Sequence, residues 1–277
     1  MKRAFVIGHP IAHSRSPKIH GHWLKTYGIA GSYEAIDVAP DDLEAFFDRI
    51  RAGEFIGGNV TVPHKEAAFE LCDTRDFDTS HIGAFNTLTT SNGAEGTAIH
   101  GTNTDHYGFL ANLDEQAPGW SDGLKKAIVI GAGGAARGVV SALVARGVLR
   151  VIIINRTVET AEQLASELPG PLFAYGFDAW GVQAPNTQFV VNTTTVGMHG
   201  SRFEALDLAL LPKQALVTDI VYTPLETPLL ADARQLGLRT ADGLGMLLHQ
   251  AVPGFEAWFG RRPEVTAELR REIEATL

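Results

Sequence analysis

The sequence predicts an α/β protein of two domains, each built on a largely parallel sheet. Its length of 277 residues is that of about two ordinary domains. Strand-like and helix-like segments alternate along most of the chain, which is typical of parallel sheets with helical crossovers. A glycine-rich turn joins an apolar strand at 127–130 to a helix-like segment at 136–146. This turn marks a second domain of Rossmann type, which begins only after a hundred residues of other structure.

The first third of the chain is expected to alternate short strands with helices. The pattern predicts strands at 4–7, 33–38 and 55–62, helices at 17–27, 41–51 and 65–71, and a hairpin of 85–90 with 96–100. Ser16 is expected to cap the first helix, Pro17 to open it and Gly28 to end it. Asn92-Gly93 is expected to form the hairpin turn, which adds antiparallel strands to the sheet.

The remainder is expected to hold the Rossmann-like domain and a helical tail. Further strands are predicted at 151–154, 189–192 and 216–221, and two helices within 243–277, split near Gly260 and Pro263. The polar, turn-rich segment 116–126 is the best candidate for a linker. The predicted domains are therefore 1–115 and 116–246, with the helices of about 247–277 packing back onto the first.

Composition limits the classes of partner and compartment. A formal net charge of −9 argues against a broad nucleic-acid or anionic-membrane surface. The single Cys72 excludes internal disulfides and fits a reducing, cytoplasmic setting. Residues 1–10 lack the apolar segment of a signal peptide, and no apolar run approaches ~18 residues. The ten histidines show no metal-ligand spacing.

The glycine-rich turn carries the spacing of a dinucleotide site. Gly131, Gly133 and Ala136 match G-x-G-x-x-G/A between a strand and a helix, with a second strand at the right distance. Residues without a large side chain let the backbone approach a pyrophosphate, and the helix N-terminus offers N–H donors to it. The alternative is a tight turn with no ligand.

The end of the second strand in this unit indicates which dinucleotide binds. NAD sites usually carry Asp or Glu there, whereas this chain has Asn155 followed by Arg156. Asn155 does not repel a 2′-phosphate, and Arg156 can bind one through charge-assisted hydrogen bonds. The sequence therefore favours NADP(H). The alternative is a solvated arginine beside Thr157 acting as an N-cap.

Three polar motifs in the first domain admit two interpretations each. Ser14 and Ser16 could bind a carboxylate near a helix N-terminus, or Ser16 could be an ordinary cap. Lys65 follows a strand end, where open α/β sheets bind ligands, but an exposed lysine is common there. Asp105 could be catalytic or an N-cap. Taken singly, these residues favour the structural interpretations.

Read together, the motifs resemble the shikimate dehydrogenase family over nearly the whole chain. The resemblance lies in the order of several blocks. They are residues 8–17 (GHPIAHSRSP), 58–65 (GNVTVPHK), 82–87 (IGAFNT), 101–109 (GTNTDHYGF), the glycine turn, 155–157 (NRT), 192–198 (NTTTVGM), 219–222 (DIVY) and 243–250 (GLGMLLHQ).

This resemblance implies two α/β domains with a cleft between them. The activity it implies is the NADP-dependent, reversible reduction of 3-dehydroshikimate to shikimate in aromatic amino-acid biosynthesis. Lys65 and Asp105 would be the catalytic pair. The substrate would contact Ser14, Ser16, Thr61, Lys65, Asn86, Asp105, Tyr222 and Gln250. The cofactor would contact Gly131, Ala132, Gly133, Gly134, Ala135, Asn155, Arg156, Thr157, Thr193, Val221, Gly243 and Met246.

Three residues depart from the family pattern and leave alternatives open. Gly21 stands where many members have Asn, Phe85 where a small aliphatic residue is common, and Thr160 where some carry a second arginine for the 2′-phosphate. A paralogue that oxidises quinate or uses NAD is the nearest alternative. A non-catalytic nucleotide-binding regulator is the rival from another class, and the presence of both Lys65 and Asp105 argues against it. A monomer or homodimer with a small-molecule substrate is expected.

Overall fold

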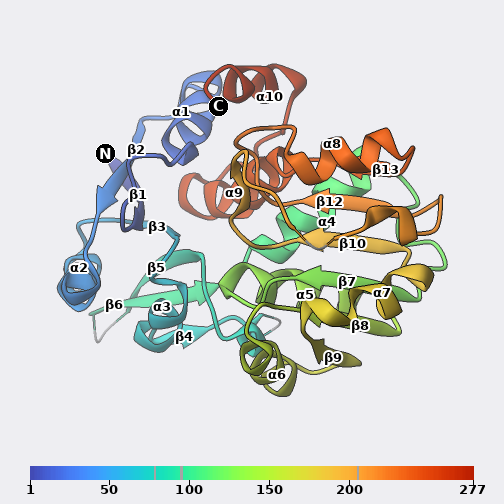
Figure 1. Ribbon diagram of the computed structural model, residues 1–277. Coiled ribbons are helices and arrows are strands. Elements are labelled where there is room, and N and C mark those ends of the chain that lie inside the picture. Colours follow the sequence, from blue (N-terminus) through green and yellow to red (C-terminus); the bar gives the residue numbers. More distant parts are fainter. Residues whose placement is uncertain (78, 94–95, 205) are drawn as a thin grey trace. The chain divides into compact units, whose positions relative to one another are not determined.

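The computed structural model describes residues 1–77, 79–93, 96–204 and 206–277 (Figure 1). The chain falls into two compact units. Unit 1 comprises Met1–Thr104 and Gln250–Thr276, and unit 2 comprises Asp105–His249 with Leu277. The sequence predicts domain boundaries near 115/116 and 246/247. The assignment of these domains to substrate and cofactor remains a prediction.

Unit 1 contains a six-stranded sheet in the order β2-β1-β3-β5-β6-β4. Its strands are β1 (Lys2–Gly8), β2 (Gly31–Asp37), β3 (Gly57–Val60), β4 (Thr74–Arg75), β5 (Thr87–Gly93) and β6 (Gly96–Thr102). Strand β1 runs parallel to both β2 and β3, whereas β5 is antiparallel to β3 and β6. The predicted parallel sheet with an antiparallel hairpin is confirmed, although β3 is shorter than the predicted 55–62.

The predicted hairpin turn is wrong. Asn92 and Gly93 belong to β5, where they pair with Thr97 and Gly96 of β6. The Thr97 hydroxyl donates to Asn92 Oδ1 at 3.1 Å, so this cross-strand contact extends the ladder past the turn signal in the sequence. Residues 94 and 95 lie outside the described part of the chain.

The helices of unit 1 cover both faces of its sheet. They are α1 (Ser16–Thr26), α2 (Leu43–Arg51), α3 (Lys65–Leu71), α10 (Ala267–Glu274) and the part of α9 (Leu244–Phe259) from Gln250 onward, with short 3₁₀ helices at Pro40–Asp42 and Ser80–Ile82. The predicted apolar stripe of α2 is buried against β1 and β3; its members are Leu43, Phe46, Phe47 and Ile50. On the other face, Trp23 of α1 packs against Phe255 of α9 at 5.3 Å between ring centroids.

The start of α1 differs from the prediction. Arg15 is the residue before the helix, and Ser16 lies within its first turn. Ser16 therefore does not cap α1. Instead, the backbone N–H of Ser16 donates to Ser14 Oγ at 3.3 Å. The predicted end is confirmed, because Gly28 follows the helix with φ of +63°, a conformation that favours glycine.

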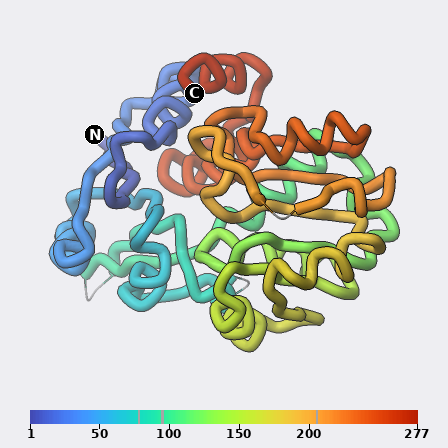
Figure 2. Tube along the Cα trace, in the orientation of Figure 1, coloured from blue at the N-terminus to red at the C-terminus, as the bar shows by residue number. Residues whose placement is uncertain are grey.

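The C-terminal helix α10 lies beside α1 (Figures 1 and 2). Arg15 donates from Nη2 to the Thr276 carbonyl at 2.6 Å, and the Trp23 indole donates to the Glu264 carbonyl at 3.0 Å. The predicted two-helix tail is confirmed, and Gly260, with φ of +75°, follows α9. The tail thus fixes the helix that follows the Ser14 loop.

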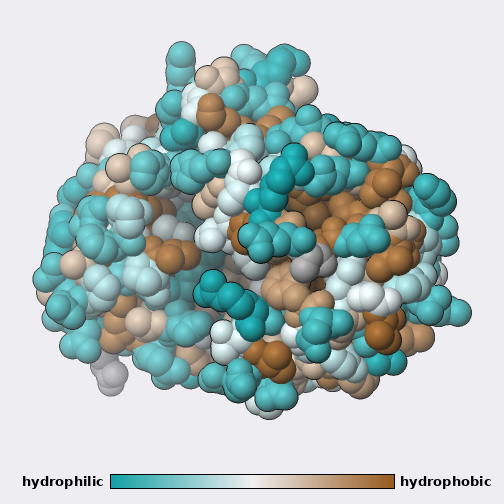
Figure 3. Space-filling view, in the orientation of Figure 1, coloured by the Kyte–Doolittle hydropathy of each residue, from teal (hydrophilic) through white to brown (hydrophobic). Residues whose placement is uncertain are grey.

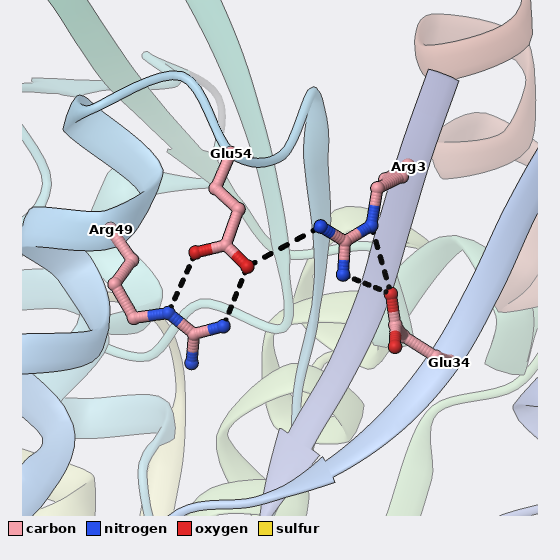
Figure 4. Close-up of polar contacts among 4 residues, drawn as sticks. All are labelled: Arg3, Glu34, Arg49 and Glu54. Atoms are coloured by element: carbon pink, nitrogen blue, oxygen red, sulfur yellow. Dashed lines mark hydrogen bonds and ion pairs between the residues drawn. The ribbon is translucent and has the colours of Figure 1, made fainter. Parts of the chain in front are cut away.

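A network of charged residues joins the strands of unit 1 at the edge where β1 begins. Glu54 accepts from Arg49 at 2.7 and 2.8 Å and from Arg3 at 3.3 Å, and Arg3 also donates to Glu34 of β2 (Figure 4). These side chains are between about a third and a half exposed, so water and salt screen each ion pair. The network stabilises the edge opposite to the loops that follow β1 and β3.

Unit 2 contains a six-stranded sheet in the order β13-β12-β10-β7-β8-β9, and every pair is parallel. This is the doubly wound order of Rossmann folds, and it confirms the predicted βαβ unit. The strands are β7 (Lys126–Ile130), β8 (Arg150–Ile154), β9 (Leu172–Tyr175), β10 (Phe189–Asn192), β12 (Leu216–Asp219) and β13 (Arg239–Ala241), with the short β11 (Val196–His199) apart. The segment proposed as a linker joins α4 to β7 within this unit.

Helices cover both faces of the second sheet. They are α4 (Asp105–Gln116), α5 (Gly134–Ala145), α6 (Val158–Glu167), α7 (Trp180–Gln183) and α8 (Pro228–Gln235), with 3₁₀ helices at Phe177–Ala179, Ala184–Asn186 and Leu208–Leu210. Within β7, Val129 packs toward α4, α5 and α6, whereas Ile128 and Ile130 pack toward α7 and α8. Full burial of such a side chain contributes about 1.5–3 kcal/mol, which explains the continuous apolar runs of these strands.

Candidate functional site

The carboxyl ends of β1 and β3 form one edge of the unit 1 sheet. Loops follow Gly8 and Val60, and backbone hydrogen bonds join them: Thr61 donates to Ile7 at 2.8 Å, and His9 donates to Val62 at 3.0 Å. A Cβ on Gly8 would lie 2.6 Å from Thr61 Cγ2, so this close approach requires glycine. The two loops therefore hold Thr61 and the Ser14 segment at the same edge.

Lys65 is the first residue of α3, and its backbone is held on both sides. The preceding His64 is buried and donates from Nε2 to the Val38 carbonyl at 2.7 Å. The Phe85 N–H donates to the Lys65 carbonyl at 2.9 Å. Lys65 itself is partly exposed, as expected of a residue that meets a ligand.

A buried network of neutral side chains surrounds Asn86. Asn86 Nδ2 donates to Thr104 Oγ1 and to Gln250 Oε1, both at 3.1 Å, while the Thr104 N–H donates to Asn86 Oδ1 at 2.7 Å. The Thr104 hydroxyl donates to the Gln250 carbonyl at 2.9 Å. Behind them, Asn59 donates from Nδ2 to the Asn86 carbonyl at 3.0 Å. Sequence analysis found Asn86 and Gln250 but missed Asn59 and Thr104.

This network fixes the two points at which the chain passes between the units. The chain leaves unit 1 after Thr104 and returns at Gln250, and these two residues are hydrogen bonded. Asp105 follows Thr104 directly and is 6% exposed. It is the first residue of α4.

The glycine turn of unit 2 fits a dinucleotide. Gly131 follows β7 directly with φ of +108°, and a Cβ there would lie 2.7 Å from Thr193 Oγ1. By contrast, a Cβ on Gly133 or Gly134 would meet nothing within 4 Å. The space beside these two glycines at the N-terminus of α5, where backbone N–H groups could bind a pyrophosphate, is therefore open. This turn lies between β7 and β10, where the strand order reverses and doubly wound sheets bind dinucleotides.

The residues after β8 leave an exposed cation at the predicted 2′-phosphate position. Asn155 donates from Nδ2 to the Thr157 carbonyl at 2.9 Å, and this bond closes the turn around Arg156. Arg156 is exposed. Thr157 is the N-cap residue of α6, but its side chain makes no capping hydrogen bond. Thr160 is exposed on the same helix.

The remaining predicted cofactor residues lie where β10, β12 and β13 end. Thr193 follows β10, Val221 follows β12, and Gly243 follows β13 by two residues. Tyr222, predicted to contact the substrate, comes directly after Val221. A Cβ on Gly243 would lie 2.6 Å from the Asp219 carbonyl, so only glycine lets this segment approach β12. Met246, in the first turn of α9, packs into the core that α4 and α5 share.

The structure shows the surroundings of Gly21 and Phe85, two of the three residues that depart from the family pattern. Gly21 lies in α1, exposed, with open space where a Cβ would point, so the helix does not require glycine there. Phe85 is fully buried and packs against Phe69 at 4.9 Å between ring centroids. A Cβ on Gly101 would lie 2.2 Å from the Phe85 ring, so Gly101 provides the space for the larger side chain.

The described residues contain no candidate metal site and no candidate membrane-spanning helix. Among the described residues, no group of three or more His, Cys, Asp or Glu side chains could hold a metal ion. No described helix is both long and apolar enough to cross a membrane. On the face drawn in Figure 3, hydrophilic residues cover much of the surface and hydrophobic ones lie between them.

These features define a class: an α/β protein with a Rossmann-type dinucleotide-binding unit and a second unit rich in buried polar side chains. Family models agree with this class along the chain. A shikimate dehydrogenase substrate-binding domain matches residues 6–88, a shikimate/quinate 5-dehydrogenase domain matches 116–221, and a shikimate 5′-dehydrogenase C-terminal domain matches 243–267. The chain belongs to the shikimate dehydrogenase family.

Individual relatives extend over the full length. Shikimate dehydrogenase (NADP(+)) of Mesorhizobium japonicum is 55% identical over 276 residues, which cover 100% of this chain and 97% of the relative. Shikimate 5-dehydrogenase of Thermus thermophilus, solved with NADP(H) and shikimate, is 35% identical with a TM-score of 0.84 over 100% of this chain and 99% of that one. Quinate dehydrogenase of Corynebacterium glutamicum, solved with NAD, is 31% identical with a TM-score of 0.89 over 99% of both chains.

Proposed function

We infer that this protein is an NADP-dependent oxidoreductase that interconverts shikimate and 3-dehydroshikimate. The observation that carries this inference is the 55% identity, over the whole chain, with a shikimate dehydrogenase (NADP(+)). The residues of the chain agree with it. Arg156 is exposed at the end of β8, where an acidic residue would favour NAD, and the open glycine turn fits the pyrophosphate.

The chain's own residues divide the remaining work. A bound NADP supplies the hydride chemistry, so the protein needs to bind the alcohol and move one proton. We assign the proton at the reacting oxygen to Lys65, with Asp105 as the second member of the catalytic pair. The hydroxyls of Ser14 and Ser16 would donate to the substrate carboxylate.

The buried network supports the assignment of the ring-hydroxyl contacts. Asn86 and Gln250 are nearly buried, at 3% and 8% exposed, and they are held by each other and by Thr104. Side chains fixed in this way lose little conformational entropy when they bind a ligand. We therefore propose Thr61, Asn86 and Gln250 as partners of the ring hydroxyls, with Tyr222 nearby.

A spectrophotometric assay tests the proposed function. Absorbance at about 340 nm is followed with shikimate or quinate as substrate and with NADP or NAD as cofactor. The proposal expects the largest kcat/KM for shikimate with NADP. A larger kcat/KM for quinate with NAD would assign the chain to the activity of its Corynebacterium relative. No turnover in any combination, with NADP bound, would make it a nucleotide-binding regulator.

The setting of the enzyme follows from the same proposal. We propose one small-molecule substrate, a cytoplasmic location, and assembly as a monomer or homodimer. Sedimentation of the full chain, with and without NADP, measures the assembly directly.

A further inference from the structure

A buried polar cluster in unit 2 takes no part in the chemistry described above. It consists of Asn192 at the end of β10, Asp219 at the end of β12, Thr194 after β10, and Thr227 at the start of α8. Asn192, Asp219 and Thr227 are each fully buried. We call these four residues the Asp219 cluster. A carboxyl group with no exposed surface is costly to keep, so its position calls for an explanation.

Asp219 accepts three hydrogen bonds from three different segments. Asn192 donates from Nδ2 at 2.8 Å, the Val221 backbone N–H donates at 2.9 Å, and the Thr227 hydroxyl donates at 2.7 Å. Burial, the largest cause, raises the pKa of the Asp219 carboxyl to about 6, although these three donors oppose the rise. The carboxyl thus fixes the loop after β12 to β10 and to α8.

Asn192 and Gly243 extend the same arrangement to neighbouring segments. Asn192 Oδ1 accepts from the Thr194 N–H at 2.9 Å and from the Thr194 hydroxyl at 2.7 Å, which fixes the loop after β10. Gly243 approaches the backbone of Asp219 and Ile220 so closely that a Cβ there would lie about 2.5 Å from the Ile220 carbonyl oxygen. All the segments that carry Thr193, Val221, Tyr222 and Gly243 therefore meet at Asp219.

These segments belong to one half of the dinucleotide site. A Rossmann sheet consists of two mononucleotide-binding halves, and the half formed by β7, β8 and β9 holds the adenosine side through the glycine turn and the residues after β8. The half formed by β10, β12 and β13 is left for the nicotinamide mononucleotide. The Asp219 cluster lies wholly in this second half.

We propose that Asp219 is a positioning residue that shapes the nicotinamide half of the cofactor site by fixing the loops after β10 and β12. The proposal rests on the proposed function for the identity of the cofactor. It assigns no contact between Asp219 and the cofactor. Asp219 acts through the backbone of Val221 and through Asn192, so its loss should weaken cofactor binding selectively, in the half that these loops form.

Binding measurements on the full chain separate the two halves. Isothermal titration of Asp219→Ala uses NADP, which fills both halves, and adenosine 2′,5′-bisphosphate, which fills only the adenosine half. We expect the Kd for NADP to rise about tenfold, while the Kd for the bisphosphate stays within about twofold of wild type. Asp219→Asn keeps an acceptor for Val221 and the shape of the side chain, so it should restore NADP binding to within about threefold.

The controls make each outcome decisive. Asp232→Ala removes an exposed acidic residue from α8 whose partner is Arg202, and it should leave both ligands unaffected. If Asp219→Ala does not fold, Thr227→Val replaces it, because this variant removes one donor to Asp219. The same changes in Kd are then expected. Equal losses for NADP and the bisphosphate, or normal NADP binding, would overturn the proposal. Failure of the wild-type protein to bind NADP would instead overturn the proposed function.

Discussion

The two units use different groups at their predicted binding sites. In unit 1 the predicted contacts are side chains, and Asn86, Thr104 and Gln250 hold one another through donors and acceptors that lie far apart in sequence. In unit 2 the surface around the glycine turn consists of backbone, open at Gly133 and Gly134. Side chains can supply a proton and choose a substrate, whereas backbone N–H groups can hold a phosphate without moving a proton. The difference suggests that chemistry and cofactor recognition are separable tasks.

The largest expected effect concerns the proposed catalytic pair, Lys65 of unit 1 and Asp105 of unit 2. Asp105→Asn keeps the size of the side chain and removes its charge, so it should lower kcat by about 10²–10⁴-fold, as is typical when a positioned proton-transfer group is lost. The Kd for NADP should change little, because the glycine turn and Arg156 remain. Asp114→Asn, an exposed position near the other end of α4, is the matched control. Near-normal turnover in Asp105→Asn would remove this residue from the mechanism.

The next effect concerns recognition in unit 2. Arg156→Ala should weaken NADP binding by about 10- to 150-fold, because a hydrogen bond to a charged group contributes about 1.5–3 kcal/mol. NAD binding should barely change, since NAD lacks the 2′-phosphate. Arg150→Ala, at the opposite end of β8 and stacked on Phe173, should leave both cofactors unaffected. If both cofactors weaken equally in Arg156→Ala, Arg156 has no special role toward the phosphate.

The substrate carboxylate offers a smaller effect that distinguishes binding from folding. Ser14→Ala and Ser16→Ala should each raise the KM for shikimate by about 10-fold with kcat unchanged, because a hydrogen bond to a charged carboxylate contributes at least about 1.5 kcal/mol. Ser16 does not cap α1, so a capping loss is not expected from it. Variants that melt earlier but keep wild-type KM would show that both serines serve only the fold.

Acidification should change the free energy of unfolding in opposite directions through one buried group in each unit, His20 and Asp219. Burial lowers the pKa of His20, stacked on Tyr33 at 3.9 Å, from 6.5 to about 3, and it raises that of Asp219 from 3.8 to about 6. Buried His20 binds a proton less readily in the folded state than in the unfolded state. Its contribution to the free energy of unfolding is therefore lost as pH falls from 6.5 toward 3. Buried Asp219 binds a proton more readily in the folded state than in the unfolded state. The free energy of unfolding therefore rises as pH falls from about 6 toward 3.8. The limiting slope for each group is about 1.4 kcal/mol per pH unit.

Urea unfolding at several pH values between about 7 and 4 measures the free energy of unfolding. The difference between wild type and a variant that lacks one group gives the contribution of that group. The free energy of unfolding of wild type should fall relative to that of His20→Phe as the solution is acidified. It should rise relative to that of Asp219→Asn over the same range. Parallel curves for wild type and a variant would mean that the group in question does not titrate in this way.

The same contrast between side chains and backbone explains what could be predicted from the sequence. The βαβ unit with Gly131 and Gly133 was predictable because strand, turn and helix are contiguous and each has a local signal. The helix at Lys65–Leu71 was predictable for the same reason. The short strands β4 and β13 carry too few residues for a period to be recognised, and they exist because neighbouring strands pair with them. Strand β9 is as long as β10, but it lies at the edge of the sheet and is only partly buried.

The supporting polar residues could not be predicted from local pattern. Asn59 and Thr104 meet Asn86 only because β3, β5 and β6 are adjacent in the sheet. Asn192 meets Asp219 because β10 lies beside β12. A polar residue at the end of a buried strand was the available signal, but the strand order was needed to give it a partner. The predicted Ser16 cap failed because Ser14, two residues earlier, accepts the N–H of Ser16.

The most direct test of separable tasks is the double variant Lys65→Ala/Arg156→Ala, compared with both single variants in kcat/KM for NADP. Lys65→Ala should lower kcat by about 10²–10⁴-fold with the NADP Kd unchanged, and Arg156→Ala should act through NADP binding. If the tasks are independent, the two free-energy losses add in the double variant to within about 0.5 kcal/mol. A double variant no worse than the worse single one, or a loss of NADP affinity in Lys65→Ala alone, would contradict the separation of chemistry from cofactor recognition.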